Sequence, residues 1–291
     1  MRKWLVMGVV PVALGGLWFA TQAQANPLFG SGHHDNGSGV QSSGSLSMRS
    51  HTDVMQQWTG SGDGYGSGTG TDGGAVGGEN AGGAAVTQDT STNWAGYVDT
   101  GGRFTSVSAN WTQPTAQCGA DQTFSSFWVG IDGDGTGSVE QTGSEADCNG
   151  GTALYFGWFE MFPAAPVEYD KPVAAGDAMS ASVTTDGNGN FTLTLTDRTQ
   201  GWNEVTDQTS QTAQLGSAEV IAEAPSSQNG VLPLTNFGTA SFTGAEANGA
   251  PIGSSSGSTT ELTMVSGAGA LEATPSALNA AEDFSVTWNS E

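Results

Sequence analysis

Apolar and polar side chains alternate along much of the chain after about residue 90, most clearly in the segment Phe-Trp-Val-Gly-Ile-Asp at residues 127–132. Alternation with a period of two is typical of a β-strand that buries one face. A turn rich in Gly and Asp follows, and a second, short strand then carries Val139 and Gln141 on one face. The pattern therefore predicts a β-hairpin at the centre of the folded part of the chain.

Similar alternating segments fill most of the remaining chain, and turns such as Asp-Gly-Asn-Gly at 186–189 separate them. No stretch keeps the period of a helix. Many strands at short spacing, without helices to carry parallel crossovers, predict an all-β fold, an antiparallel β-sandwich. The other expected strands are Asn93–Val98, Phe104–Trp111, Tyr155–Phe162, Met179–Thr184, Phe191–Thr196, Ala213–Glu223, Ala240–Thr243, Glu261–Val265 and Phe284–Trp288.

The first 88 residues differ in composition from the rest. Two basic residues precede an apolar run, and Ala-Gln-Ala at 23–25 matches a cleavage site, so residues 1–25 are interpreted as a signal peptide, with a membrane anchor as the alternative. Residues 26–88 are rich in Gly and Ser and contain few large apolar side chains, which predicts a disordered leader or pro-segment. Residues 89–291 are expected to form the folded domain.

The charge balance narrows the range of partners. The chain has 6 Lys and Arg against 29 Asp and Glu, a formal net charge of −23. Nucleic acids and anionic membranes both require basic patches, so neither is expected as a partner. The same composition is compatible with high solubility and with acid tolerance, because protonating the carboxylates leaves few cations to repel one another.

The chain contains two cysteines, Cys118 and Cys148. In an exported protein they are expected to form a disulfide that closes a loop of about thirty residues and stabilises the fold by roughly 3–4 kcal/mol. Metal ligation is the weaker alternative, because two thiols without histidine make a poor site. The expected location is secreted: extracellular, or periplasmic if the host has an outer membrane.

Histidine is absent from the part of the chain that is expected to fold. The three histidines are His33, His34 and His51. A Ser-His-Asp triad, a Cys-His pair and a His-Glu-x-x-His zinc site all need an imidazole in the folded domain. Acid–base chemistry must therefore use carboxyl groups, amides and water, and no metal or cofactor is expected.

Aromatic and acidic side chains share faces of the predicted strands. Trp158, Glu160 and Phe162 lie on one face, with Trp94 and Trp128 on neighbouring strands. Core packing is one interpretation of these aromatic residues. A glutamate between two of them would need a partner in a dry core, so an open groove is the alternative.

Two further acidic segments allow more than one interpretation. In a strand at 218–223, Glu219 and Glu223 point the same way about 13 Å apart, too far for a shared proton, so solvated surface acids are one interpretation. The segment that begins at Asp132 resembles the start of a calcium loop. It lacks the Gly and Glu spacing of an EF-hand, which favours a hairpin turn.

Together these segments resemble the glutamic peptidases, also called eqolisins. The resemblance runs from about residue 92 to the C-terminus, and the order of its motifs is specific where each motif alone is weak. The matching segments are Asn-Trp-Ala-Gly at 93–96, Trp-Val-Gly-Ile-Asp-Gly at 128–133, Gln-Thr-Gly at 141–143, Trp-Phe-Glu-x-x-Pro at 158–163, Gly-Asp at 176–177, Ala-Glu-x-Ile-x-Glu at 218–223 and Asn-Phe-Gly-Thr at 236–239.

The resemblance implies a sandwich of two large antiparallel sheets, similar to concanavalin, with a substrate groove on a concave face. It places a catalytic Gln–Glu pair at Gln141 and Glu223 and does not assign that role to Glu219. It also implies groove positions, which are Trp94, Trp128, Asp132, Trp158 and Glu160. The sequence departs from the family pattern at four positions near these motifs, Glu145, Phe156, Phe162 and Val220.

The implied pair makes chemical sense for hydrolysis of a peptide bond. An ionised Glu223 can accept a proton from water and pass it to the leaving amine, while the Gln141 amide orients the water and donates to the oxyanion. For Glu223 to stay partly ionised in acid, nearby donors are expected to keep its pKa low. Polypeptides are the expected substrates, and a monomer is expected.

Two other classes of function fit parts of the sequence. One is a carbohydrate-binding module with a tryptophan-lined groove. The other is a retaining glycosidase with two carboxyl groups about 5 Å apart, such as Glu140 and Glu160. Neither accounts for a glutamine in the central hairpin.

Overall fold

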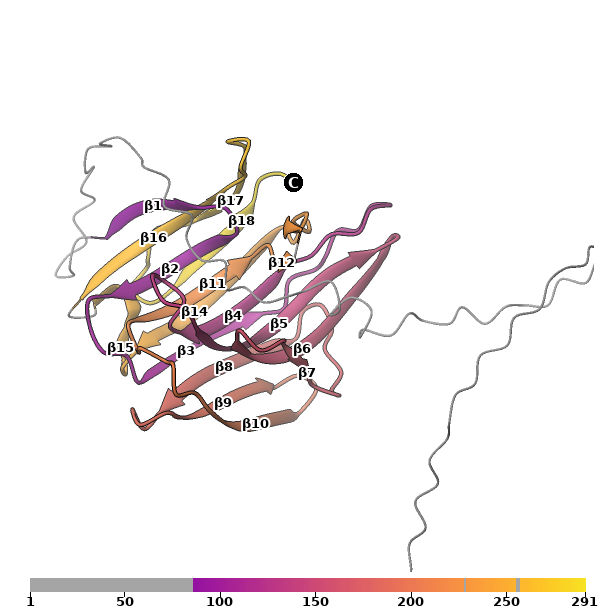
Figure 1. The fold of residues 1–291 in the computed structure, drawn as a ribbon. Helices are drawn as coiled ribbons and strands as arrows, with labels where there is room; N and C mark the ends of the chain where they lie inside the picture. The colour runs from indigo at the N-terminus through magenta and orange to yellow at the C-terminus, as the bar shows by residue number, and fades with distance from the viewer. Residues whose placement is uncertain (1–85, 228, 255–256) are drawn as a thin grey trace, which may run out of the picture. The chain divides into compact units, whose positions relative to one another are not determined.

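The computed structural model describes residues 86–227, 229–254 and 257–291 (Figure 1). The predicted signal peptide and nearly all of the predicted leader lie outside these residues. Among the described residues, no helix is long and apolar enough to cross a membrane. In chain order the elements are β1 (Thr87–Ser91), β2 (Trp94–Thr100), β3 (Ser106–Thr112), β4 (Ser126–Ile131), β5 (Val139–Asn149), β6 (Thr152–Phe162), β7 (Val167–Glu168), β8 (Ala178–Thr185), β9 (Asn190–Asp197), β10 (Trp202–Thr209), β11 (Ser217–Glu223), β12 (Ser226–Ser227), β13 (Gly230–Val231), β14 (Thr239–Ala247), β15 (Ala250–Pro251), the 3₁₀ turn η1 (Ile252–Ser254), β16 (Ser258–Val265), β17 (Leu271–Pro275) and β18 (Phe284–Trp288).

Nearly all of these strands belong to one hydrogen-bonded path that folds back on itself. The order along the path is β10-β9-β8-β3-β14-β18-β17-β16-β2-β11-β4-β5-β6-β7, with β1 and β15 added at its sides. Its pairings are antiparallel, except for the parallel pair of β1 with β16. The front layer, which contains β2, β11, β4, β5 and β6, lies over β3, β8, β9 and β14 (Figure 1). The predicted β-sandwich is confirmed.

The main core lies between the two layers. Phe127, Val129 and Ile131 of β4 point into it and are completely buried, as their alternation predicts. Opposite them, apolar residues of β8 and β9 such as Val183 and Leu193 are equally buried. Each such side chain stabilises the fold by about 1.5–3 kcal/mol relative to an exposed position.

The central hairpin forms as predicted, but its second strand is not short. β5 has eleven residues, and it pairs with β4 over 140–145 and with β6 along its whole length. The turn between β5 and β6 is made by Gly150 and Gly151, whose φ angles of 57° and 84° suit glycine. The residues after Gln141 are mostly polar, so the sequence pattern does not indicate a continued strand. In the structure these polar side chains are nevertheless buried.

Other strand boundaries also differ from the prediction. Residues 213–216 are predicted to start a strand but form a loop, because Asp132 accepts hydrogen bonds from their backbone. β10 is absent from the predicted strands. Within the described part of the chain it is an edge strand that pairs only with β9, so it needs few apolar side chains. β1 crosses the boundary expected between residues 88 and 89, so the sheet already begins at Thr87.

Cys118 and Cys148 form a disulfide with a Cα–Cα distance of 5.3 Å, as the sequence predicts. The bond joins the segment before β4 to the end of β5, and no free cysteine is left in the described part of the chain. It therefore fastens the far end of the central hairpin to the chain that leads into it.

Replacing both cysteines with alanine is expected to lower the free energy of unfolding by about 2–4 kcal/mol, because the unfolded chain loses its cross-link. Urea unfolding of the double variant beside the wild type measures the difference. A thiol titration of the unfolded, unreduced protein is the control and should find no free thiol. Two titratable thiols would show that the bond does not form.

Candidate active site

A second apolar cluster lies on the face of the front layer that points away from the main core, called the site face below. It consists of Trp94, Val98, Trp128, Val139, Phe156, Trp158, Ile221 and Leu262, with Phe162 packed against it. The three tryptophans are at most 1% exposed. Sequence reasoning left core packing and an open groove as alternatives. The structure shows a separate cluster whose aromatic side chains are buried.

The strand register arranges the site face in three rows that cross β11, β4, β5 and β6. The first row is Glu219, Gly130, Gln141 and Glu160. The second row is Ile221, Trp128, Gly143 and Trp158. The third row is Glu223, Ser126, Glu145 and Phe156. The Gln, the Glu and four of the five groove positions that the resemblance implies therefore lie on or beside one buried face.

The second row places two large indoles, Trp128 and Trp158, on either side of a glycine, Gly143. Trp128 meets Trp94 edge to face, with ring centroids 5.1 Å apart. At Gly143, a Cβ atom would lie 2.5 Å from the Trp128 Cβ and 2.3 Å from the Phe127 carbonyl oxygen, so a larger residue cannot fit. The Gln-Thr-Gly motif thus ends in glycine because the neighbouring strand backbone and indole come so close.

Glu223 is completely buried and is held by two donors. The Trp128 indole N–H donates to its Oε2 at 2.7 Å, and the Asn93 amide donates to its Oε1 at 3.2 Å. The Ser91 hydroxyl in turn donates to the side-chain Oδ1 of Asn93 at 3.2 Å and orients that amide. Asn93 is part of a matching motif, but sequence reasoning did not identify it as a partner of Glu223.

The pKa of Glu223 is raised well above the usual carboxyl value, mainly by burial and further by the charge of Glu160. The hydrogen bonds from Trp128 and Asn93 lower it only in part. The expectation of a low pKa for Glu223 is therefore wrong, because removing the carboxylate from water outweighs the donors around it.

Gln141 is fixed by Glu160 on the next strand. Its amide nitrogen donates to the Glu160 Oε2 at 2.6 Å, and both side chains are completely buried. An amide nitrogen carries two donors, so this bond occupies one of them and sets the plane of the amide. The indole of Trp128 lies between the rows of Gln141 and Glu223, so it connects the two positions.

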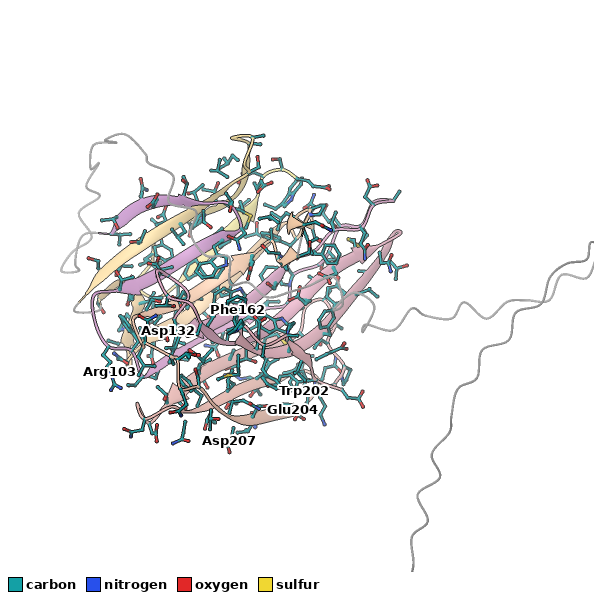
Figure 2. The ribbon with its side chains drawn as sticks, viewed as in Figure 1. Arg103, Asp132, Phe162, Trp202, Glu204 and Asp207 are labelled. Atoms are coloured by element: carbon teal, nitrogen blue, oxygen red, sulfur yellow. A yellow bond between two sulfur atoms is a disulfide. The ribbon has the colours of Figure 1, made fainter. Side chains whose placement is uncertain are left out.

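Asp132 has surroundings unlike those of the other implied groove residues. It lies at the end of β4 (Figure 2), and its two carboxylate oxygens accept the backbone N–H groups of Gln214, Leu215 and Gly216 at 2.7–2.9 Å. It therefore holds the loop that leads into β11. No group of three or more metal-ligating side chains occurs among the described residues, and Asp132 itself is engaged by the backbone.

The carboxyl pair that would suit a glycosidase does not form. Glu160 pairs across the strands with Gln141, so it lies on the site face. Glu140 precedes Gln141 in β5 and points to the opposite face, where burial and then the charge of Asp132 raise its pKa to about 7. The two carboxyl groups therefore lie on opposite sides of the front layer.

Sequence reasoning noted Glu145 only as a departure from the family pattern and missed its buried neighbour Asp147. Glu145 and Asp147 of β5 are at most 2% exposed, and the backbone N–H of Ser125 donates to Asp147 at 3.1 Å. Burial raises the pKa of Glu145 well above its usual value and that of Asp147 to about 8. The spacing of two residues would place both carboxyl groups on the same face of a long strand. The sequence pattern predicts only a short strand here, so this signal was not used.

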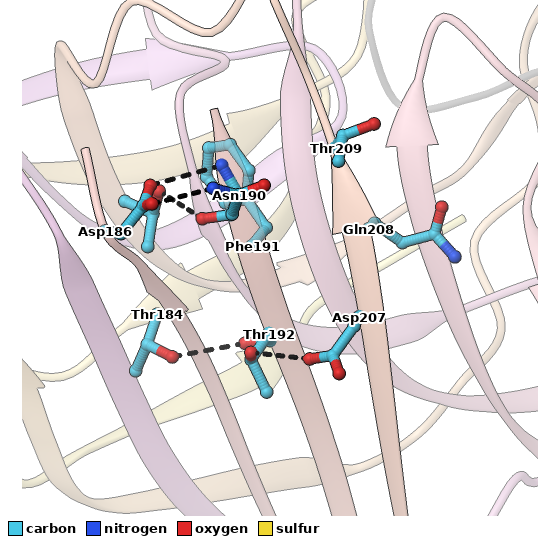
Figure 3. A pocket seen from close by; sticks show the side chains of 9 residues that line it. Thr184, Asp186, Asn190, Phe191, Thr192, Asp207, Gln208 and Thr209 are labelled. Carbon is cyan, nitrogen blue, oxygen red and sulfur yellow. Dashed lines mark hydrogen bonds between the residues drawn. The ribbon is translucent and has the colours of Figure 1, made fainter. Parts of the chain in front are cut away.

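A hollow on the molecular surface lies elsewhere, over β8, β9 and β10 (Figure 3). Its polar side chains satisfy one another: the Asn190 amide donates to Asp186 at 2.7 Å, and the Thr192 hydroxyl donates to Asp207 at 2.7 Å. It shares no residue with the site face. Although it is open to solvent, it offers no acid–base chemistry comparable to the buried carboxyl and amide groups.

Comparison with known proteins identifies the class to which this fold and site belong. Residues 92–288 match the model of the Peptidase A4 family, which covers most of the chain. The chain therefore belongs to the peptidase A4 family, the glutamic peptidases or eqolisins, as the motifs predicted. It is a glutamic endopeptidase by family.

Two fungal relatives and two solved structures illustrate the match. The chain is 27% identical to aspergillopepsin-2 of Aspergillus niger over 197 residues, which are 58% of this chain and 70% of that protein. It is 31% identical to scytalidopepsin B of Scytalidium lignicola over 112 residues, 38% of this chain and 42% of that protein. Scytalido-glutamic peptidase with a peptide-based transition state analog superposes with a TM-score of 0.59 at 22% identity, covering 69% of this chain and all of that one. Aspergilloglutamic peptidase from Aspergillus niger gives a TM-score of 0.50 at 25% identity, covering 57% of this chain and 99% of that one.

Proposed function

We propose that this peptidase is a secreted, acid-acting enzyme in which Glu223 and Gln141 activate water against a peptide bond. The observation that carries the proposal is the placement of Glu223 on a buried face with Gln141, with an indole and an amide donating to its carboxyl group. All three histidines precede residue 52, so the family domain at 92–288 holds no competing imidazole base.

Glu223 takes the proton in the first step. Its ionised form accepts a proton from water as the water oxygen bonds to the carbonyl carbon, and it then gives that proton to the amine as the C–N bond breaks. A raised pKa makes the ionised form a stronger base than an ordinary carboxylate, but it also leaves only a minor fraction of Glu223 ionised in acid. The products are a carboxylic acid and an amine.

Gln141 stabilises the negative charge that develops on the carbonyl oxygen. Its amide is already fixed by Glu160, so little reorganisation is needed when the oxyanion forms. An amide also keeps its donors at any pH, whereas a histidine would change charge across the acid range. Trp94, Trp128 and Trp158 would line the peptide's path on the same face, and Glu160 would act through Gln141.

The acid range and the secretion of the protein are supported by its composition. The net charge of −23 leaves few cations to repel one another at low pH, and residues 1–25 have the pattern of a signal peptide. We assign residues 26–88 to a leader, except for Thr87 and Gln88, which already belong to β1, and the following residues to the peptidase domain, as a monomer without a cofactor. Scytalido-glutamic peptidase was solved with a peptide-based transition state analog, which supports polypeptides as substrates.

Digestion of casein or haemoglobin in acid, set beside a glycan-binding assay, tests the proposal. The protein is expected to cleave the polypeptides below pH 6 and to bind no glycan. Activity should survive serine and cysteine reagents, inhibitors of pepsin-type enzymes and chelators, since the proposed site uses none of the groups they attack. Loss with a chelator and recovery with added metal would contradict the proposal, and so would glycan binding without proteolysis.

A further inference from the structure

Glu219 is a buried carboxyl group that the proposed chemistry does not use. It lies on β11 on the site face, and it is completely buried. Neither of its carboxyl oxygens has a hydrogen-bond partner among the described residues. Leaving such a group without partners in a dry site costs several kcal/mol, so an unsatisfied carboxyl group here indicates a place where a ligand supplies the missing bonds.

The row that contains Glu219 leads directly to Gln141. The position between them on β4 is Gly130, which has no side chain of its own and is covered by the edge of the Trp128 ring. A Cβ atom at Gly130 would lie 2.8 Å from the Trp128 ring and 3.2 Å from the Gln141 Cβ, so the glycine backbone and the indole edge form the floor. On the other side, Glu219 pairs with the apolar Val98 of β2. A ligand group that forms hydrogen bonds with Glu219 would therefore lie next to Gln141.

The surroundings of Glu219 keep it uncharged in acid. Burial raises its pKa well above the usual value, and the charges of Asp134 and Asp132 raise it further. The Ser217 hydroxyl and the Asp134 backbone N–H lower it in part as nearby donors, although neither forms a full hydrogen bond with it. In acid, Glu219 therefore offers one O–H donor and one carbonyl acceptor side by side.

We propose that Glu219 forms a subsite beside Gln141 that binds the primary amide of a glutamine or asparagine side chain in the substrate. The carboxyl O–H donates to the amide oxygen, and the amide N–H donates to the carboxyl oxygen, so both partners are satisfied at once. A trans main-chain amide points its N–H and C=O in opposite directions and cannot make both bonds. A leucine would leave Glu219 unsatisfied, and a lysine would bring a charge to an uncharged group. The subsite rests on the proposed position of the dyad.

Sets of peptides that differ only in having glutamine, leucine or lysine at one position test the subsite. The varied position is placed in turn at each of the two residues on either side of the scissile bond. Binding is measured by tryptophan fluorescence in a Glu223→Gln background, so the readout does not depend on hydrolysis. At one position the glutamine peptide is expected to bind at least about tenfold more tightly than the leucine peptide, and Glu219→Leu should abolish this difference. Glu219→Gln should keep most of it, because an amide also offers a donor and an acceptor.

Glu246→Gln is the matched control, since Glu246 lies on β14 in the other layer. An unchanged ratio between glutamine and leucine peptides in Glu219→Leu would overturn the subsite, even if the dyad is correct. If Glu219→Leu does not fold, the Glu223→Gln protein that keeps Glu219 is used to test the subsite. Its preference for glutamine over lysine should weaken as rising pH ionises Glu219 beside Asp132 and Asp134, and no change with pH would overturn the proposal. Normal hydrolysis by Glu223→Gln would instead refute the dyad.

Discussion

The free energy of unfolding is expected to fall as the pH rises from about 4 to about 8. Burial raises the pKa of Glu140 from 4.5 to about 7 and that of Asp147 from 3.8 to about 8, and it raises those of Glu145 and Glu219 as well. The folded protein therefore binds these protons more tightly than the unfolded chain. Their contribution to stability is complete below the unfolded-state pKa values near 4 and is lost as the pH passes the raised values.

The expected effect is large. Glu140 alone corresponds to a loss on the order of 3 kcal/mol across this range, and the other three groups act in the same direction. The growing negative charge of the acidic chain adds to the loss. A protein built in this way is most stable in acid, the opposite of one held by salt bridges between exposed groups.

Urea unfolding at pH 4, 6 and 8 measures the effect. Glu140→Gln and Asp147→Asn should each flatten the fall, because they remove a group that must ionise. Glu246→Gln is the matched control and should leave the slope unchanged, since Glu246 lies partly exposed on β14 and is not one of these buried groups. Stability that is constant or rises between pH 4 and pH 8 would contradict the account of these buried carboxyl groups.

Alternation of side chains was enough to predict the sandwich and its central strands. Phe127, Val129 and Ile131 alternate cleanly because one face of β4 meets the main core. The other face of β4 carries Trp128 and Gly130 for the site. Those two residues were identified through motifs and not through periodicity, since the faces of a strand that is buried on both sides are hard to tell apart.

The parts of the site that depend on tertiary contacts could not be predicted. The sequence does not show that the carboxylate of Asp132 meets the backbone of residues 214–216, because the two segments are far apart in the chain. It also does not show how deeply Glu223 is buried, and this burial decides the direction of its pKa shift. Local pattern gives the face on which a side chain lies, while desolvation depends on everything packed around it.

Substitution in the dyad is expected to abolish peptide hydrolysis while leaving the fold intact. Glu223→Gln removes the proton acceptor and should lower kcat/KM by about 10²–10⁴. Gln141→Ala removes the oxyanion donor and should cost about 10²–10³. Glu219→Gln should cost much less, because Glu219 neither accepts the water proton nor donates to the oxyanion in this scheme.

The fold is expected to survive Glu223→Gln because the carbonyl oxygen of the new amide can still accept the hydrogen bond that the Trp128 indole donates. Urea unfolding and tryptophan fluorescence of each variant provide this check. Glu246→Gln again serves as the control for a charge removed at a distance, and it should hydrolyse peptides at the wild-type rate.

The most direct test of the central claim is kcat/KM for one peptide substrate in acid, measured with folded Glu223→Gln beside the wild type. A loss of at least about a hundredfold is expected in the variant. Hydrolysis at near the wild-type rate by a folded Glu223→Gln protein would contradict the assignment of Glu223 as the group that activates water.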